Sequence, residues 1–129
     1  MAQTLDQQRA QFAWAAVNKA HESIQNFSDY KNLAKGAPAL VMGNGLMAAI
    51  AFYKSRGNAH ATQLMNDILG SLAHRAGQKG TPPFAAAMAG FQAMDSRDYM
   101  RATDEALAML KWLRQFADAV SDSTGAQTK

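Results

Sequence analysis

The sequence contains no cysteine. This absence excludes a disulfide-stapled scaffold and any metal site built on thiolates, and it agrees with the reducing interior of a cell, so we expect a cytoplasmic protein. The three histidines, His21, His60 and His74, lack the short spacing of metal ligands. We therefore expect neither a metal nor a cofactor.

The sequence also lacks the apolar stretches that mark export or membrane insertion. The N-terminus, MAQTLDQQRAQF, has neither a basic leader nor a continuous apolar run of about seven to fifteen residues. Residues 37–53 are mostly apolar, but this run is shorter than the roughly 20 residues of a membrane-spanning helix and is interrupted by Gly-Asn-Gly. We expect a soluble protein that makes no membrane contact.

Residues that favour β-structure are scarce. Valine and isoleucine together number only six, too few to build a multi-stranded sheet. Alanine is abundant and there are eight methionines, and these residue types favour helices. A chain of 129 residues is most simply one domain. We therefore predict an all-α fold, a compact bundle of about five to six helices.

Apolar spacing and capping residues divide the chain into helices. Thr4 and Gln7 form a capping-box pattern, which predicts the start of the first helix. The segment from Pro38 to about Ser55 is apolar on every side and predicts an unbroken central helix, around which the others gather. The expected segments are, in chain order, a helix at 5–27, a short turn at 30–35 that ends at Gly36, the central helix at about 38–55, a break at Gly57, a helix capped by Asn58 and ending near Arg75, a loop at 76–83, a short helix from Phe84 to near Asp95, and a last helix capped by Ser96.

The boundaries of the folded domain follow from these helices. Residues 1–120 form a single helical bundle domain in this interpretation. The last nine residues, 121–129, have too little apolar content to order themselves, so we predict a disordered C-terminal tail.

A glycine motif within the central segment allows two interpretations. Gly43, Gly45 and Ala48 match the spacing of a dinucleotide-binding turn, and Asp67 stands where a ribose-binding acid is found. Such a turn requires a preceding strand and a parallel sheet, which this composition does not supply. The alternative is a buried helix, in which the two glycines allow close packing and Asn44 is a buried amide. We favour the helix and expect no enzymatic activity.

The charge is unevenly distributed along the chain. Residues 31–94 carry six basic side chains and a single acidic one, although the formal net charge is only +3. Cations at helix ends could converge on a polyanion, or they could merely complement helix dipoles and keep the protein soluble. The sequence shows no interleaving of aromatic residues with these cations of the kind that stacks bases, so any contact with nucleic acid should be to the backbone and indifferent to base sequence. The six basic side chains are Lys31, Lys35, Lys54, Arg56, Arg75 and Lys79.

The last helix carries a second apolar line in addition to its main stripe. Met109, Trp112, Phe116 and Ala119 form this line. Either both sides of the helix are buried, or the second side faces a partner.

The order and spacing of several residues resemble a known family, the small α-helical subunit of the Cmr effector complex, the RNA-targeting type III-B CRISPR machinery. The stretch YKNLAKGAPALVMGNGLMAAIAFYKSRG carries most of the resemblance, and YMRATDEALAMLKWLRQFADA is similar to the last helix of that family. Gly36-Ala37 departs from the family pattern, which has a larger apolar residue before the proline. The matching positions in the first stretch are Tyr30, Pro38, Asn44, Gly45, Leu46, Phe52 and Lys54.

The resemblance implies a non-enzymatic subunit of an antiviral ribonucleoprotein. Several copies would stack beside other Cmr subunits and line the channel that holds guide RNA and target RNA. Together with the basic charge, it suggests that Lys54 and Arg56, with Arg75, Lys79 and Lys19, contact RNA phosphates. Trp112 and Phe116 would support packing or subunit contact. The alternative is a stand-alone helical adaptor or homodimer that uses the Trp112 and Phe116 face.

Overall fold

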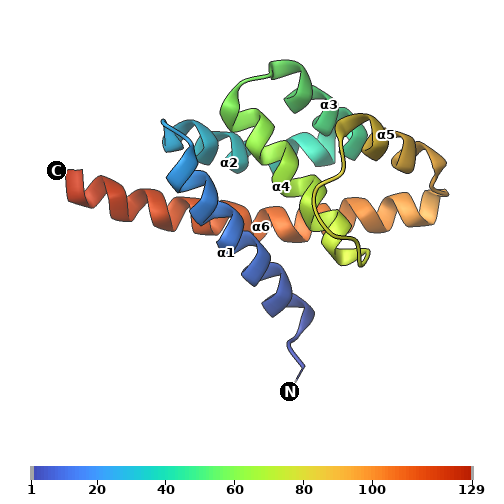
Figure 1. The fold of residues 1–129 in the computed structure, drawn as a ribbon, viewed down its shortest axis with the longest axis horizontal. Coiled ribbons are helices and arrows are strands. Elements are labelled where there is room, and N and C mark those ends of the chain that lie inside the picture. The colour runs from blue at the N-terminus through green and yellow to red at the C-terminus, as the bar shows by residue number, and fades with distance from the viewer. Residues whose placement is uncertain (1, 129) are drawn as a thin grey trace.

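The computed structural model describes residues 2–128, and it describes the side chains of residues 2–121. Within these residues the chain forms six helices and no strands, which confirms the predicted all-α bundle (Figure 1). The helices are α1 (Leu5–Ser23), α2 (Phe27–Asn44), α3 (Leu46–Arg56), α4 (Ala59–Arg75), α5 (Phe84–Ala93) and α6 (Ser96–Thr128). The predicted disordered tail, 121–129, lies outside the described side chains except for Ser121, and it stays a prediction.

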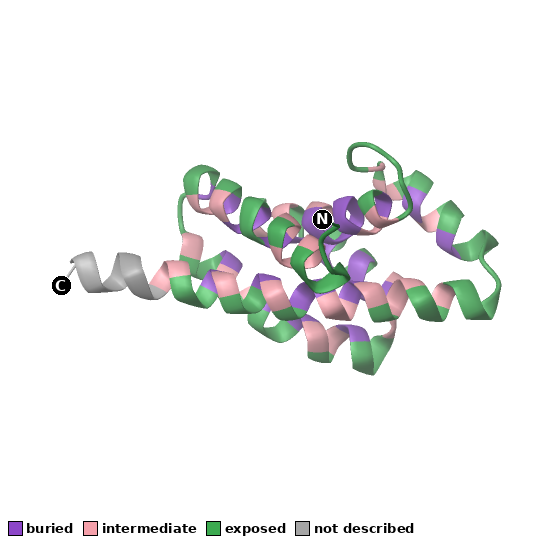
Figure 2. Cartoon of the chain, turned by 90° about the horizontal axis from the view of Figure 1, so that it is seen from below, coloured by how far each residue is buried: buried purple, intermediate pink, exposed green. Residues whose placement is uncertain are grey.

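The long helix α6 is the element on which the other helices assemble. It runs along the length of the molecule, α1 crosses it, and α2 and α4 also pack against it (Figure 1). Helix α3 packs between α2 and α4, and α5 contacts α3. Buried positions lie mainly where the helices face one another, and exposed positions cover their outer sides (Figure 2). No helix among the described residues is long and apolar enough to span a membrane.

The predicted start of the first helix is confirmed, but its end is not. The Thr4 hydroxyl accepts a hydrogen bond from the Gln7 backbone N–H, and the Gln7 side chain accepts one from the Thr4 backbone N–H. Helix α1 ends at Ser23 rather than residue 27, because Ile24 adopts an extended conformation. The chain then turns, and α2 begins at Phe27.

The prediction of an unbroken central helix at 38–55 is wrong. Helix α2 begins well before Pro38 and includes the expected turn at 30–35, together with Gly36 and Pro38 in its interior. It ends at Asn44, and Gly45 separates it from α3 with a φ of 91° and a ψ of 160°. A residue with a side chain rarely adopts this positive φ, so the break occurs where glycine permits it. A helix, not a strand, precedes the glycine motif, which rules out a dinucleotide-binding turn.

The predicted burial of this segment is also wrong in part. Asn44 is exposed rather than a buried amide, and the side chains of Met42 and Phe52 are 74% and 41% exposed. Leu46 is fully buried, as expected of an apolar core residue. The break at Gly45 is stabilised from α6, where the Tyr99 hydroxyl accepts a hydrogen bond of 3.0 Å from the Met47 backbone N–H. This long-range contact satisfies one of the free donors at the start of α3.

The remaining boundaries follow the capping residues closely. Gly57 is left-handed and the Asn58 side chain caps α4, which ends at Arg75 as predicted. The loop at 76–83 is confirmed. One cap differs from the prediction, because the Asp95 carboxylate, not Ser96, accepts the hydrogen bond of the Asp98 backbone N–H at the start of α6.

Candidate functional site

Two exposed cations lie in the last turn of α3. The Lys54 ammonium lies 5.8 Å from the centre of the Phe84 ring, and the Arg56 guanidinium lies 5.5 Å from the centre of the Phe52 ring. Neither forms an ion pair with an acid in the described part of the chain. The aromatic contacts orient the two stems while the charges stay accessible to solvent. This end of α3 can therefore receive an anion.

Two further predicted cations, Lys19 and Lys79, border adjoining hollows. Lys19 lies on α1 and borders a hollow between α1 and α4. Lys79 lies in the loop after α4 and borders a second hollow, which shares Phe12 and Thr81 with the first. Both lysines are exposed, and neither forms an ion pair among the described residues. The tertiary structure thus places two cations that lie 60 positions apart in the sequence beside hollows that share two lining residues.

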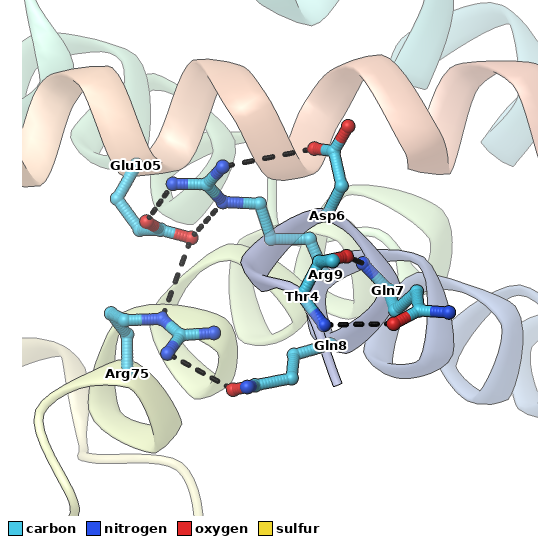
Figure 3. Close-up of polar contacts among 7 residues, drawn as sticks. All are labelled: Thr4, Asp6, Gln7, Gln8, Arg9, Arg75 and Glu105. Carbon is cyan, nitrogen blue, oxygen red and sulfur yellow. Dashed lines mark hydrogen bonds and ion pairs between the residues drawn. The ribbon is translucent and has the colours of Figure 1, made fainter. Parts of the chain in front are cut away.

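The fifth predicted cation, Arg75, is already engaged inside the protein (Figure 3). Its guanidinium donates a hydrogen bond of 3.2 Å to the Gln8 side chain, and its Nε lies 3.9 Å from a carboxylate oxygen of Glu105. The same carboxylate accepts two hydrogen bonds from Arg9, of 2.9 Å and 2.7 Å. These hydrogen bonds, with the attraction of the Glu105 charge, raise the pKa of Arg9 further against the opposing effect of burial.

This network ties α1 and α4 to α6. Arg9 and Gln8 belong to α1, Arg75 ends α4, and Glu105 lies on α6. The sequence pattern does not indicate this role for Glu105, because an acidic stretch that also contains Asp98 and Asp104 is typical of a solvated helix surface. In the structure its side chain is only 12% exposed, so the contact is shielded from solvent.

The remaining basic residues of the central segment lie between α2 and α6. Lys31, Lys35 and Arg114 border a small hollow of about 80 Å³, together with Asp118. Lys31 forms an ion pair of 3.5 Å with Asp118. The basic residues of the segment 31–94 are therefore distributed over several faces, and they do not form one continuous patch.

A buried carboxyl group lies next to the Lys19 hollow. The Tyr30 hydroxyl donates a hydrogen bond of 2.5 Å to one oxygen of Asp67, and the Gln63 amide donates one of 2.8 Å to the other. Burial raises the pKa of Asp67 to about 6, although both hydrogen bonds and the charge of Lys19 act in the opposite direction. Burial, with the nearby Asp67 charge, also raises the pKa of Tyr30. Tyr30, one of the positions that carry the family resemblance, thus holds the one acidic side chain of segment 31–94.

The pKa of Asp67 predicts the effect of Asp67→Asn on stability. A carboxyl whose pKa is higher in the folded than in the unfolded state contributes stability below its unfolded value of 3.8, and this contribution is lost as the pH rises through about 6. We expect the effect of Asp67→Asn on the free energy of unfolding to be about 2 kcal/mol more favourable at pH 7 than at pH 4, because the amide carries no charge at either pH. The amide has a single acceptor oxygen, so the loss of one of the two hydrogen bonds lowers the free energy of unfolding at both pH values. Thermal unfolding at both pH values measures this difference. The exposed Asp104→Asn is the control, and an equal effect at both pH values would contradict the prediction.

Trp112 and Phe116 lie against the core rather than standing free. Both are partly buried and pack on the buried cluster, and their rings lie 5.7 Å apart. The Phe116 ring also meets the edge of Trp14 on α1 at 5.2 Å, and Trp14 is 49% exposed. The structure thus favours the packing role for the second apolar line, while Trp14 adds an exposed aromatic edge beside it.

The histidines form no metal-binding cluster among the described residues. His21 lies against the Phe27 ring, and His74 lies 5.7 Å from the Phe12 ring, centre to centre. Among the described residues, no group of three or more histidine, aspartate or glutamate side chains is placed to hold a metal ion.

Three comparisons with known proteins agree on one family. The family model described as CRISPR-associated protein (Cas_Cmr5) matches residues 5–120. The CRISPR system Cmr subunit Cmr5 of Thermus thermophilus is 32% identical over 117 residues, which cover 91% of this chain and 96% of that protein. The crystal structure of a CRISPR-associated Cmr5 family protein from the same species has a TM-score of 0.75 at 30% identity, and the match covers 92% of this chain and 97% of that one. The chain therefore belongs to the Cmr5 family of CRISPR-associated proteins.

Proposed function

We propose that this protein is a non-enzymatic structural subunit of a CRISPR Cmr ribonucleoprotein in the cytoplasm, where it contributes to antiviral defence. Several copies stack along the guide and target RNA and contact other Cmr subunits. The relative from Thermus thermophilus bears the name of a Cmr subunit, and it matches this chain along almost its whole length. The basic surface of the bundle then faces RNA phosphates.

The observation that carries this proposal is the pair of free cations at the end of α3. Lys54 and Arg56 are exposed, oriented by aromatic rings and unpaired with any acid in the described part of the chain. An exposed cation without an internal partner can approach a phosphate without first breaking an ion pair. Lys19 and Lys79 are also exposed and form no ion pair among the described residues, whereas Arg75 is the least suited of the five, because Gln8 and Glu105 already hold it.

The experiment is a charge reversal at the end of α3. We expect the double variant Lys54→Glu and Arg56→Glu to weaken retention of RNA by the complex purified from the native host. If both side chains contact phosphates, the slope of log affinity against log salt concentration should fall by about 1.4 for single-stranded RNA. Retention of guide and target RNA across a salt series measures this slope.

The matched control reverses the exposed pair Arg97 and Arg101 at the start of α6. It makes the same change in net charge at another part of the bundle. An unchanged affinity and slope in the α3 variant would refute the assignment of Lys54 and Arg56. An equal loss of RNA retention in both variants would mean that the overall charge, rather than these two positions, causes the effect.

A second candidate function, a stand-alone adaptor or homodimer, is favoured by one observation. Trp14 is half exposed and lies edge-on against Phe116, beside Trp112. An exposed tryptophan of this kind is typical of protein contacts. Light scattering on the purified chain separates the two functions, because a stable dimer without affinity for RNA or Cmr subunits would support the adaptor.

A further inference from the structure

The two hollows beside Lys19 and Lys79 form one groove, which we call the α1–α4 groove. Each half has a volume of about 290 Å³, close to the lower limit for small-ligand sites, and the halves meet at Phe12 and Thr81. Residues of α1 and α4 line the half beside Lys19, and Thr81 of the loop at 76–83 borders both halves.

The half beside Lys19 has an apolar wall and a polar wall. Phe12, Ala15 and Ala16 of α1 form the apolar wall, and three side chains of α4 face it: Gln63, Asn66 and Asp67, whose carboxylate already accepts hydrogen bonds from Gln63 and Tyr30. Gln63 uses its amide N–H on Asp67, which leaves its carbonyl oxygen available. The Asn66 side chain makes no hydrogen bond among the described residues, so its donor and acceptor are both unused. An aromatic face beside amide groups suits a flat ring with polar edges, which is the chemistry of a nucleobase.

The half beside Lys79 is cationic and rich in glycine. Lys79 and His74 border it, together with Gln78 and Gly80. Among the described residues, no acidic side chain lines this half, whereas Asp67 lines the other. Lys19, whose charge also acts on Asp67, borders the other half, so each half has one exposed lysine beside the shared Phe12. A lysine in each half can contact a phosphate on either side of a base that stacks on Phe12.

Gly70 sets the packing at the junction of the two halves. A Cβ atom at this position would lie 3.0 Å from the Thr81 hydroxyl oxygen and 3.4 Å from the Phe12 ring. Both neighbours can approach α4 this closely because Gly70 has no side chain. The ring of Phe12 is therefore held at the centre of the groove by close packing, with part of its surface exposed.

We propose that the α1–α4 groove binds one unstacked nucleotide of single-stranded RNA, with the base between Phe12 and Asn66 and the flanking phosphates at Lys19 and Lys79. This inference rests on the proposed function, which places the protein against RNA. It also revises the expectation from the sequence that contact with RNA is indifferent to base identity. Asn66 gives the groove a means to distinguish bases by their edges.

The test uses the Cmr complex purified from the native host and loaded with RNA that contains 4-thiouridine. After irradiation, mass spectrometry locates the crosslinked residues, and we expect them at Phe12 and in the segment 63–81. Phe12→Leu keeps an apolar side chain but removes the aromatic face. It should lower this crosslink yield at least about fivefold, because the loss of one base–aromatic stack weakens binding by at least that factor. The matched control is Lys35→Glu, which alters an exposed charge outside the groove.

A second variant separates base recognition from a structural role. Asn66→Ala should change the relative crosslink yields of RNAs that differ only in the base next to the thiouridine, whereas a purely structural defect would lower all yields alike. Thermal unfolding of each variant checks that the bundle is intact. In a parallel series, free mononucleotides or an RNA hexamer compete with the RNA that contains 4-thiouridine. If mononucleotides block the groove crosslink at the same concentration as the hexamer, the assignment to a strand is overturned.

The failure of this inference can be distinguished from failure of the proposed function. If the complex retains RNA and loses it in the Lys54→Glu and Arg56→Glu variant, yet shows no crosslink in the groove, the groove proposal is overturned and the subunit function stands. If no RNA accompanies the complex and no residue crosslinks, both proposals are overturned. Wild-type yields in both Phe12→Leu and Asn66→Ala would also overturn the groove proposal.

Discussion

Replacing Glu105 with alanine is expected to lower the free energy of unfolding by about 2–3 kcal/mol. The substitution removes the acceptor of two Arg9 hydrogen bonds and the only carboxylate within 4 Å of the Arg75 guanidinium among the described residues. Two guanidinium groups on different helices would then share a poorly solvated region without an acid between them (Figure 3). Loss of one partner from a shielded ion pair costs more than the pair itself contributes, because the remaining charge is left uncompensated.

Thermal unfolding of the purified chain measures this effect, with an expected fall in Tm of about 10 °C. The neighbouring Asp104→Ala is the matched control, because Asp104 is exposed and forms no ion pair in the described part of the chain. A change below about 0.5 kcal/mol in Glu105→Ala, equal to that of an ordinary surface substitution, would show that the network does not tie the helices together.

The substitution Leu113→Ala should have a still larger effect, about 3–4 kcal/mol of destabilisation. Leu113 is fully buried on α6, the helix against which α1, α2 and α4 all pack. Truncation removes apolar surface from the core and leaves a cavity that rigid helices cannot fill completely. We expect a fall in Tm of about 15 °C, with the helical content at low temperature unchanged.

The control for this prediction is Met100→Ala on the same helix. The Met100 side chain is 64% exposed, so its removal changes little buried surface. Chemical denaturation should show an unchanged dependence on denaturant concentration and a shifted midpoint only for Leu113→Ala. A similar shift for both variants would mean that helix propensity, rather than core packing, controls the stability of α6.

Local signals in the sequence predicted several elements well. The capping box at Thr4, the break at Gly57 and the cap at Asn58 were each confirmed at the residue expected. These features depend on neighbours within about one helical turn, so a linear pattern contains the information that they need. The family resemblance was confirmed in the same way, because residue order and spacing are also linear.

The central segment was mispredicted because the competing signals depend on distant residues. Gly36 and Pro38 predict the end of one helix and the start of the next, yet α2 continues through both, and the actual break lies at Gly45. The Tyr99 hydroxyl on α6 accepts the hydrogen bond of a free backbone N–H at the start of α3, and no pattern near Gly45 in the sequence predicts that contact. A tertiary hydrogen bond thus decided between two breaks that the sequence allowed.

The same distinction between local and long-range information applies to the candidate site. Composition was enough to predict a helical protein with a basic central segment, because residue type alone governs helix preference and charge. The family came from the resemblance of the residue order to known members, which the comparisons confirmed. Folding decided which cations remain available. It joins Lys19 and Lys79 along one groove and encloses Arg75 beside Glu105, because helix packing brings together side chains that are far apart in the chain.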